Sequence, residues 1–266
     1  MTASPRGITL IINNVSFAHH PKDERQLLPR HGSEEDVRQV EGLFKALDFL
    51  VQKKQNLSKE QLEGVLGEIT CEDHSDYDCF VLWLMSHGES GEVVCFDRQM
   101  MPIQQIHDMF SQCQTLSGKP KLFFIQACRG VKKDEGVNVF VDHDASSPYR
   151  ANKIIESNKA DPVIQLKIPS NSDFLYSFST VDDYVSYRHP KFGSHYVRCF
   201  VEAFREHVAH EHILDILTVV NHKVSKMKAT RPSTANENET KTFKQMSEVR
   251  HTLRKKIHFS THSCGL

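Results

Sequence analysis

The chain has 266 residues, of which 39% are hydrophobic and 25% are charged, an ordinary composition for a globular protein with a substantial core. Its 33 basic and 34 acidic side chains nearly cancel, so no global field favours nucleic acid and any recognition by charge must be local. No apolar run approaches the roughly 18 to 20 residues that span a bilayer, and no signal-peptide core follows Met1. We therefore expect no nucleic-acid partner and no membrane association.

Cysteine and histidine usage favours a reducing compartment without a metal centre. Most cysteines lie inside apolar stretches, where a reduced thiol packs as a small hydrophobe. Their number is odd and they are scattered: Cys71, Cys79, Cys95, Cys113, Cys128, Cys199 and Cys264. This pattern predicts a cytoplasmic protein. Sixteen histidines are present, but the Cys/His spacing of a zinc module is missing, so we expect no metal and no cofactor.

The first elements in chain order are a short strand and an amphipathic helix. Residues 7–13 form an apolar run that predicts a strand, and no segment long enough to fold separately precedes it, so we expect no prodomain. A helix is predicted from Ser33, with acidic residues 34–36 at its positive N-terminal end. Its apolar face has spacings of three and four: Val37, Val40, Phe44, Leu47 and Val51.

Two more helices and two buried strands follow. Ser58 and Gln61 resemble a capping box at the start of one helix, and a helical stripe runs from Ile103 to Cys113. Residues 79–85 and 122–125 are apolar throughout, which is typical of strands buried on both faces of a parallel sheet. The alternation predicts an α/β fold in three layers, with a mostly parallel central sheet and helices on both faces.

The second half of the chain begins after a polar stretch. Residues 131–167 have no sustained apolar period and read as a linker, after which 174–179 predict another strand. Ser194 is expected to cap a helix, and a further helical face runs from Ile213 to Val224. The segment 226–244 reads as a loop. A last strand is expected around Leu253, Ile257 and Phe259.

Two residues with catalytic chemistry each follow a predicted buried strand. His87 and Cys128 lie just past carboxyl ends of strands, where ligands bind in open α/β sheets. A free cysteine, with a pKa of about 8.5, needs a neighbour to become a nucleophile. His87 can act as general base toward the thiol or water, and as general acid toward a leaving amine. The N–H groups of Gly88 and Cys128 could stabilise an oxyanion. No third carboxylate stands out, so we expect a dyad.

The residues around this cysteine carry a family resemblance. Gln126-Ala127-Cys128-Arg129-Gly130, with an upstream histidine, is a caspase signature. Further matching motifs are residues 28–32, 185–188, 193–194 and 252–256. The chain thus resembles a caspase catalytic domain from Ile8 through Phe259, which implies a caspase-like sandwich and a cysteine endopeptidase.

The resemblance also implies a pocket for an aspartate side chain at the cleavage position. It assigns Arg30, Gln126 and Arg188 to this pocket, and paired guanidiniums are rigid forked donors suited to a carboxylate. An asparagine substrate would lose the charge-assisted bonds. Without the surrounding motif, either arginine would instead be read as an exposed surface charge.

Three neighbouring residues receive substrate-binding roles by resemblance. Ser186 would lie in the strand that pairs with the substrate backbone, and Tyr187 would wall the adjoining subsite. The alternative for Tyr187 is an ordinary strand aromatic. His195 stands where many family members have tryptophan, so we expect the fourth subsite to differ from a standard Trp-lined one.

Processing and pairing follow from the same resemblance. Asp142 and Asp144 stand in the linker, where the enzyme's own specificity permits cleavage, and we favour Asp144 because small Ala145 follows it. The alternative is that both are solvated linker acids. Residues 1–144 would form the large subunit, 145–167 the rest of the linker and 168–266 the small subunit, together one domain. Two such units are expected to pair through the small-subunit edge strand.

The expected activity is cleavage of proteins after aspartate in exposed loops, through an acyl-enzyme, in apoptosis or inflammatory signalling. Inhibitors of apoptosis or adaptors are further candidate partners. One alternative is a relative that cuts after Arg or Lys, which would need acidic specificity residues in place of Arg30 and Arg188. Another is a catalytically weak regulator that heterodimerises with an active caspase; intact Cys128 and His87 argue against it.

Overall fold

The computed structural model describes residues 1–19, 27–137, 167–232 and 240–259, with a six-stranded sheet at its centre. The strand order is β15-β9-β7-β3-β1-β2. All neighbours are parallel except β15, which pairs antiparallel with β9. The strands are β1 (Gly7–Asn13), β2 (Leu50–Gln55), β3 (Cys79–Met85), β7 (Lys121–Gln126), β9 (Phe174–Phe178) and β15 (Glu248–His251). The predicted mostly parallel sheet is confirmed.

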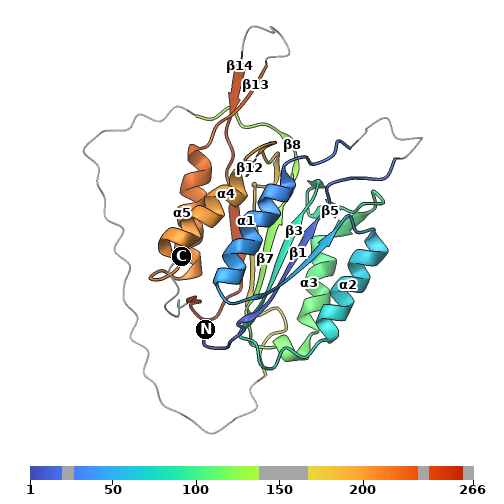
Figure 1. Ribbon diagram of the computed structural model, residues 1–266, viewed down its shortest axis with the longest axis vertical. Coiled ribbons are helices and arrows are strands. Elements are labelled where there is room, and N and C mark those ends of the chain that lie inside the picture. Colours follow the sequence, from blue (N-terminus) through green and yellow to red (C-terminus); the bar gives the residue numbers. More distant parts are fainter. Residues whose placement is uncertain (20–26, 138–166, 233–239, 260–266) are drawn as a thin grey trace.

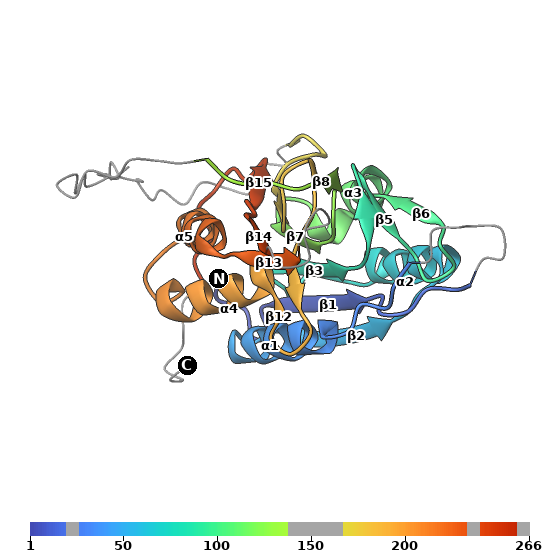
Figure 2. The ribbon, with the colours of Figure 1, turned by 90° about the horizontal axis from the view of Figure 1, so that it is seen from above.

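Helices cover both faces of this sheet (Figures 1 and 2). One layer consists of α1 (Ser33–Ala46), α4 (His195–His207) and α5 (Ile213–Lys226), and the other of α2 (Lys59–Cys71) and α3 (Ile103–Ser111). Side chains of β3 alternate between two buried apolar clusters: Val81 and Trp83 pack in the α4 layer, whereas Phe80 and Leu82 pack in the α2 layer. The three-layer prediction is confirmed.

The helix predicted from Ser33 is shorter than expected. It ends at Ala46, and Val51 lies in β2, a strand that the sequence did not predict. Asp48 adopts a left-handed φ of 64°, which turns the chain between the two elements. Because β2 is a largely exposed edge strand, it lacks the apolar run that marks the central strands.

Two predictions near the C-terminus were wrong. The last strand is Glu248–His251, whereas Leu253, Ile257 and Phe259 lie outside any strand. Ile257 and Phe259 are buried against the α4 layer, so their apolar spacing marked burial and not a strand. The segment read as a loop contains the antiparallel pair β13 (Ala229–Pro232) and β14 (Thr240–Phe243).

The two predicted helix caps had different outcomes. Ser58 Oγ accepts from the Gln61 N–H at 3.2 Å and Gln61 Oε1 accepts from the Ser58 N–H at 2.9 Å, which confirms the capping box of α2. Ser194 occupies the N-cap position of α4, but its side chain makes no capping hydrogen bond. Its hydroxyl donates instead to Asp36.

Small sheets extend the carboxyl ends of the central strands. After β3, strands β4 (Gly88–Glu89), β5 (Glu92–Val94) and β6 (Met100–Pro102) form one of them. Strand β8 (Gly130–Lys132) pairs with β10 (Asp183–Tyr184), and β11 (Arg188–His189) pairs with β12 (Gly193–Ser194). Part of the predicted linker therefore forms a strand. Asp142 and Asp144 lie outside the described residues.

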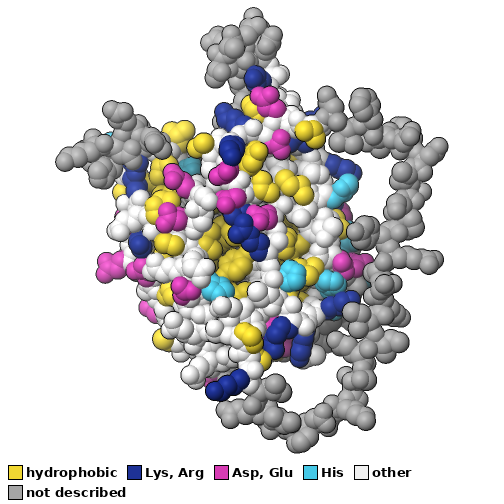
Figure 3. All heavy atoms as spheres, turned by 180° about the vertical axis from the view of Figure 1, so that it is seen from behind, with side chains coloured by type: hydrophobic (Ala, Val, Ile, Leu, Met, Phe, Trp, Pro, Cys, Tyr) yellow, Lys and Arg dark blue, Asp and Glu magenta, His cyan; other side chains and the backbone are white. Residues whose placement is uncertain are grey.

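The helices of the described ranges are all too short or too polar to cross a membrane. Acidic and basic side chains are interspersed on the face seen in Figure 3, as the balanced composition predicts.

Candidate active site

A cavity of about 290 Å³ collects most of the predicted site residues. It lies past the carboxyl ends of β3 and β7, and its lining includes Arg30, His87, Gln126, Cys128, Ser186, Tyr187 and Arg188. Segments from both halves of the chain thus meet at one place. Gly88 directly follows the lining residue His87, and His195 is not among the lining residues.

Cys128 follows β7 by two residues and is a free, partly exposed thiol. Its sulfur accepts the N–H of Ser186 at 3.4 Å and lies 3.9 Å from the carbonyl oxygen of Ser186. Ser186 belongs to the segment between β10 and β11, which the sequence assigned to substrate pairing. In this arrangement that segment contacts the Cys128 thiol itself.

The imidazole of His87 is oriented by a backbone carbonyl. Its Nε2 lies 2.8 Å from the oxygen of Leu28. Because a carbonyl can only accept, Nε2 must carry a hydrogen, which leaves Nδ1 of a neutral ring free to accept a proton. Burial, with the positive charges of Arg30 and Arg188, lowers the pKa of His87 even though the Leu28 contact raises it. The ring is therefore neutral at neutral pH, the form that a general base requires.

Gly88 brings the chain after His87 close to the backbone of Cys128. A Cβ at this position would lie 2.8 Å from the Cys128 carbonyl oxygen and 2.7 Å from that of Glu92. Both are backbone atoms that cannot rotate away, so only glycine fits here.

Arg30 is buried and only partly satisfied. Its side chain is 1% exposed, and Nη1 donates to Asn13 Oδ1 at 2.8 Å and to the Asn14 carbonyl at 2.9 Å. Nη2 is buried without a hydrogen-bond partner in the part of the chain described. Burial, and next the charge of Arg188, lowers the pKa of Arg30 to about 9, so it stays charged at neutral pH. A buried charged donor without a partner is costly unless an anion binds. Arg30 is therefore not an ordinary surface charge.

Arg188 and Gln126 lie at the same cavity but are held differently. Arg188 Nε donates to the His31 carbonyl at 3.0 Å, and no described carboxylate forms an ion pair with its guanidinium. Gln126 Nε2 donates to Ser186 Oγ at 2.8 Å, while its Oε1 is buried with no partner among the described residues. The amide nitrogen is thus used within the protein, and a donor role toward substrate requires the amide to turn.

Tyr187 and His195 contact each other through their rings. Tyr187 is 4% exposed, lines the cavity and stacks on Phe243 of β14 at 6.3 Å between centroids. His195, the first residue of α4, is also buried, and its ring centroid lies 6.2 Å from that of Tyr187. Burial lowers the pKa of His195, which makes it a small neutral ring at neutral pH.

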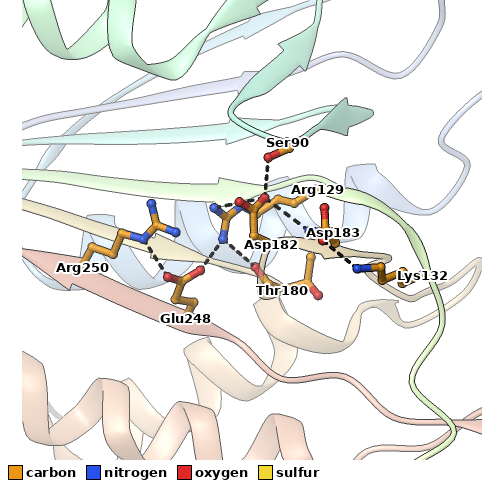
Figure 4. Close-up of polar contacts among 8 residues, drawn as sticks. All are labelled: Ser90, Arg129, Lys132, Thr180, Asp182, Asp183, Glu248 and Arg250. Atoms are coloured by element: carbon orange, nitrogen blue, oxygen red, sulfur yellow. Dashed lines mark hydrogen bonds and ion pairs between the residues drawn. The ribbon is translucent and has the colours of Figure 1, made fainter.

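Arg129, the residue after Cys128, connects the end of β7 to three other segments (Figure 4). Its buried guanidinium contacts Glu248 of β15, lies 3.5 Å from Asp182 and covers the Phe178 ring at 4.2 Å. Asp182 in turn accepts from Ser90 Oγ at 2.7 Å, in the turn between β4 and β5. The sequence did not predict this network, because its members are distant along the chain and individually ordinary.

Within the described residues, no group of three or more His, Cys, Asp or Glu side chains could hold a metal ion. The chemistry of the cavity is that of a thiol, an imidazole and two guanidiniums.

Comparison with known proteins identifies the family. Residues 6–258 match the family model of the caspase domain. The chain belongs to the caspase family. Caspase-7 of Gallus gallus is 38% identical over 221 residues, which cover 82% of this chain and 67% of that protein. Caspase-8 of Mus musculus is 34% identical over 265 residues, 97% of this chain and 52% of that protein. The chain thus spans about half the length of this caspase-8.

The fold comparison agrees. The crystal structure of caspase-1 from Spodoptera frugiperda has a TM-score of 0.81 and 29% identity, and the alignment covers 98% of this chain and 94% of that one. The expected caspase-like sandwich is confirmed, and membership supports a protease of the cysteine class.

Proposed function

We propose that this caspase-family chain is an endopeptidase that cleaves proteins after aspartate with Cys128 as nucleophile and His87 as its base. The observation that carries the proposal is the buried guanidinium of Arg30, whose Nη2 has no partner among the described residues, in the cavity that Cys128 and His87 also line. Arg188 adds a second positive charge there. A carboxylate side chain supplies the missing acceptor and is the ligand that forked donors favour.

The reaction follows from these positions. The side-chain carboxylate of the substrate aspartate accepts hydrogen bonds from Arg30 and Arg188. This contact directs the backbone carbonyl carbon of the same aspartate toward Cys128. His87 Nδ1 removes the thiol proton as sulfur attacks this carbon, and later delivers that proton to the leaving amine. The N–H groups of Gly88 and Cys128 stabilise the oxyanion. Water, activated by His87, then hydrolyses the thioester.

Ser186 must change partners during binding. Its N–H now donates to the sulfur and its hydroxyl accepts from Gln126. When a substrate strand pairs with residues 186–188, the backbone of this segment exchanges the sulfur contact for substrate contacts. Tyr187 walls the adjoining subsite, and a neutral His195 gives the fourth subsite a smaller ring than tryptophan.

Activation and assembly are part of the same proposal. Cleavage after Asp144 or Asp142 yields a large subunit, 1–144, and a small one, 168–266 after the rest of the linker. Two such pairs join through β15, which has β9 as its single neighbour within the described sheet. Met246, just before β15, is 39% exposed, and hydrophobic side chains gather in the middle of the face that Figure 3 views from the β15 side. The enzyme would act in the cytoplasm, in apoptosis or inflammatory signalling, on exposed Asp-containing loops, with apoptosis inhibitors or adaptors as partners.

A covalent probe tests the proposed nucleophile and pocket together. A peptide acyloxymethyl ketone ending in aspartate should alkylate the protein once, and mass spectrometry should map the adduct to Cys128. The same probe ending in lysine should not react, and Cys128→Ser should remove the adduct. Labelling of another cysteine, or equal labelling by the two probes, would contradict the proposal.

A further inference from the structure

The hairpin that carries Arg188 rests on the start of α1. Its strands β11 and β12 pair Arg188 with Ser194 and His189 with Gly193. A Cβ on Gly32, just before α1, would lie 2.4 Å from the Pro190 carbonyl oxygen in the hairpin turn. A Cβ on Gly193 would lie 2.4 Å from Asp36 Oδ1. Two glycines therefore allow the close approach of α1 and the hairpin: Gly32 approaches the backbone of Pro190, and Gly193 approaches the side chain of Asp36.

Asp36 makes the polar part of this contact. It is fully buried on α1, and its two oxygens accept from the N–H of Ser194 at 2.7 Å and from the hydroxyl of Ser194 at 2.6 Å. Ser194 stands at the N-cap position of α4, where a serine hydroxyl ordinarily accepts from the helix. Here the hydroxyl donates to Asp36 and makes no capping hydrogen bond to α4.

Burial of the Asp36 carboxyl carries an electrostatic cost at neutral pH. Its carboxylate forms no ion pair in the described parts of the chain; the charged groups that act on it are Arg30, before α1, and Arg188, on β11. Burial raises the pKa of Asp36 to about 6 even though the Ser194 hydrogen bonds and both arginines lower it. A carboxyl with a raised pKa favours the folded state in its protonated form, and this contribution is lost as pH rises through 6. At neutral pH the buried charge therefore opposes folding.

We propose that Asp36 is a positioning residue for the substrate aspartate. It accepts two hydrogen bonds from Ser194 and thereby holds Arg188, the cross-strand partner of Ser194, beside Arg30 at the cavity. The inference rests on the proposed function, because it concerns how the proposed carboxylate pocket is held. It also joins the two halves of the chain, since Asp36 belongs to residues 1–144 and Ser194 to residues 168–266. Arg188 Nε, which donates to the His31 carbonyl, completes the same attachment.

Steady-state kinetics with Asp-ended fluorogenic peptides test this role. In Asp36→Ala, loss of an acceptor for two buried donors should raise KM by about 10- to 100-fold, while kcat stays within about threefold. Asp36→Asn retains an oxygen for the Ser194 N–H and places an amide beside the hydroxyl, so its KM should stay within about threefold of wild type. Glu60→Gln, which changes an exposed acid in the first turn of α2, is the control and should leave KM unchanged.

Two further readouts separate positioning from folding. Asp36→Asn should not lower Tm at pH 7.4, since the buried charge opposes folding there. If Asp36→Ala fails to fold, Ser194→Ala, which deletes the hydroxyl donor alone, should raise KM by roughly 3- to 10-fold. The preference for Asp-ended over Asn-ended peptides should fall in parallel, because Arg188 is the displaced group.

Unchanged KM in Asp36→Ala or in Ser194→Ala would overturn the inference, as would a fall in kcat alone. These results presuppose a wild-type chain that cleaves Asp peptides. If the wild type cleaves none, the proposed function itself is wrong; if it cleaves them and the variants match it, the fault lies with the role of Asp36.

Discussion

His87 takes its proposed role from two features of its surroundings, a backbone carbonyl and a partly buried position. The Leu28 oxygen fixes the hydrogen on Nε2, and burial lowers the pKa of the ring below the ordinary value of 6.5. A histidine with a lowered pKa remains an unprotonated base to a lower pH. The acid limb of kcat/KM for Asp-ended peptides should therefore have its midpoint below pH 6.5. A midpoint at or above pH 7 would contradict this account of His87.

Gly88 offers a second test at a single residue. An added Cβ would collide with the backbone oxygens of Cys128 and Glu92, which moves the N–H proposed for the oxyanion. Gly88→Ala should lower kcat by about 100- to 1,000-fold, the usual loss when one oxyanion donor is removed. Gly64→Ala is the matched control: a Cβ at Gly64 on α2 meets nothing within 4 Å, so activity should be retained. Full activity of Gly88→Ala would exclude this role.

At the residue scale, the sequence indicated which side chains lie at the cavity, but it did not indicate which backbone groups contact them. Cys128, His87, Arg30 and Arg188 line one cavity, as their motifs indicated. The Leu28 carbonyl could not be predicted, because every residue has a carbonyl and only the fold decides which one meets His87. Asp36 was read only as a charge favouring the helix N-terminus, since its partner Ser194 is distant in sequence.

At the scale of elements, Arg129 joins the end of β7 to β15 and to the turn between β4 and β5. Arg129→Ala should lower the free energy of unfolding by about 3 kcal/mol, the lower end of the cost of breaking a buried pair, because the Glu248 side chain remains 25% exposed. Denaturant unfolding in a Cys128→Ala background measures this without self-cleavage. Arg250→Ala is the control: its side chain is 56% exposed beside the same Glu248, so the change should stay below about 1 kcal/mol. Equal losses in the two variants would contradict the assigned importance of Arg129.

The predicted elements succeeded where burial was strong and failed where it was weak. Strands β3 and β7 are buried on both faces and were evident as apolar runs. The edge strand β2 and the largely exposed strand β14 carry little apolar pattern, so the sequence missed them. At the other extreme, Ile257 and Phe259 are buried outside any strand, so their pattern indicated the core without indicating the secondary structure.

At the scale of the whole molecule, the two halves of the chain form one sheet and one cavity, so cleavage between them should leave the fold intact. Strands β7 and β9, from opposite sides of the proposed cleavage sites, pair along five residues. Active protein should therefore migrate as two fragments on a denaturing gel and as one species under native conditions. Asp142→Ala combined with Asp144→Ala should prevent the cut. A single uncut chain in fully active wild-type protein would contradict the processing scheme.

The central claim is that a cavity with two guanidiniums and a thiol selects a carboxylate for hydrolysis. Turnover of matched fluorogenic peptides ending in Asp, Asn, Glu, Arg and Lys tests it most directly, with Cys128→Ala as control and in salt that promotes pairing. We predict turnover of the Asp peptide at least about 100-fold above the Asn peptide, since a missing charge-assisted bond leaves Arg30 unpaired, and none in the control. Preference for Arg or Lys, or activity that survives Cys128→Ala, would contradict the account.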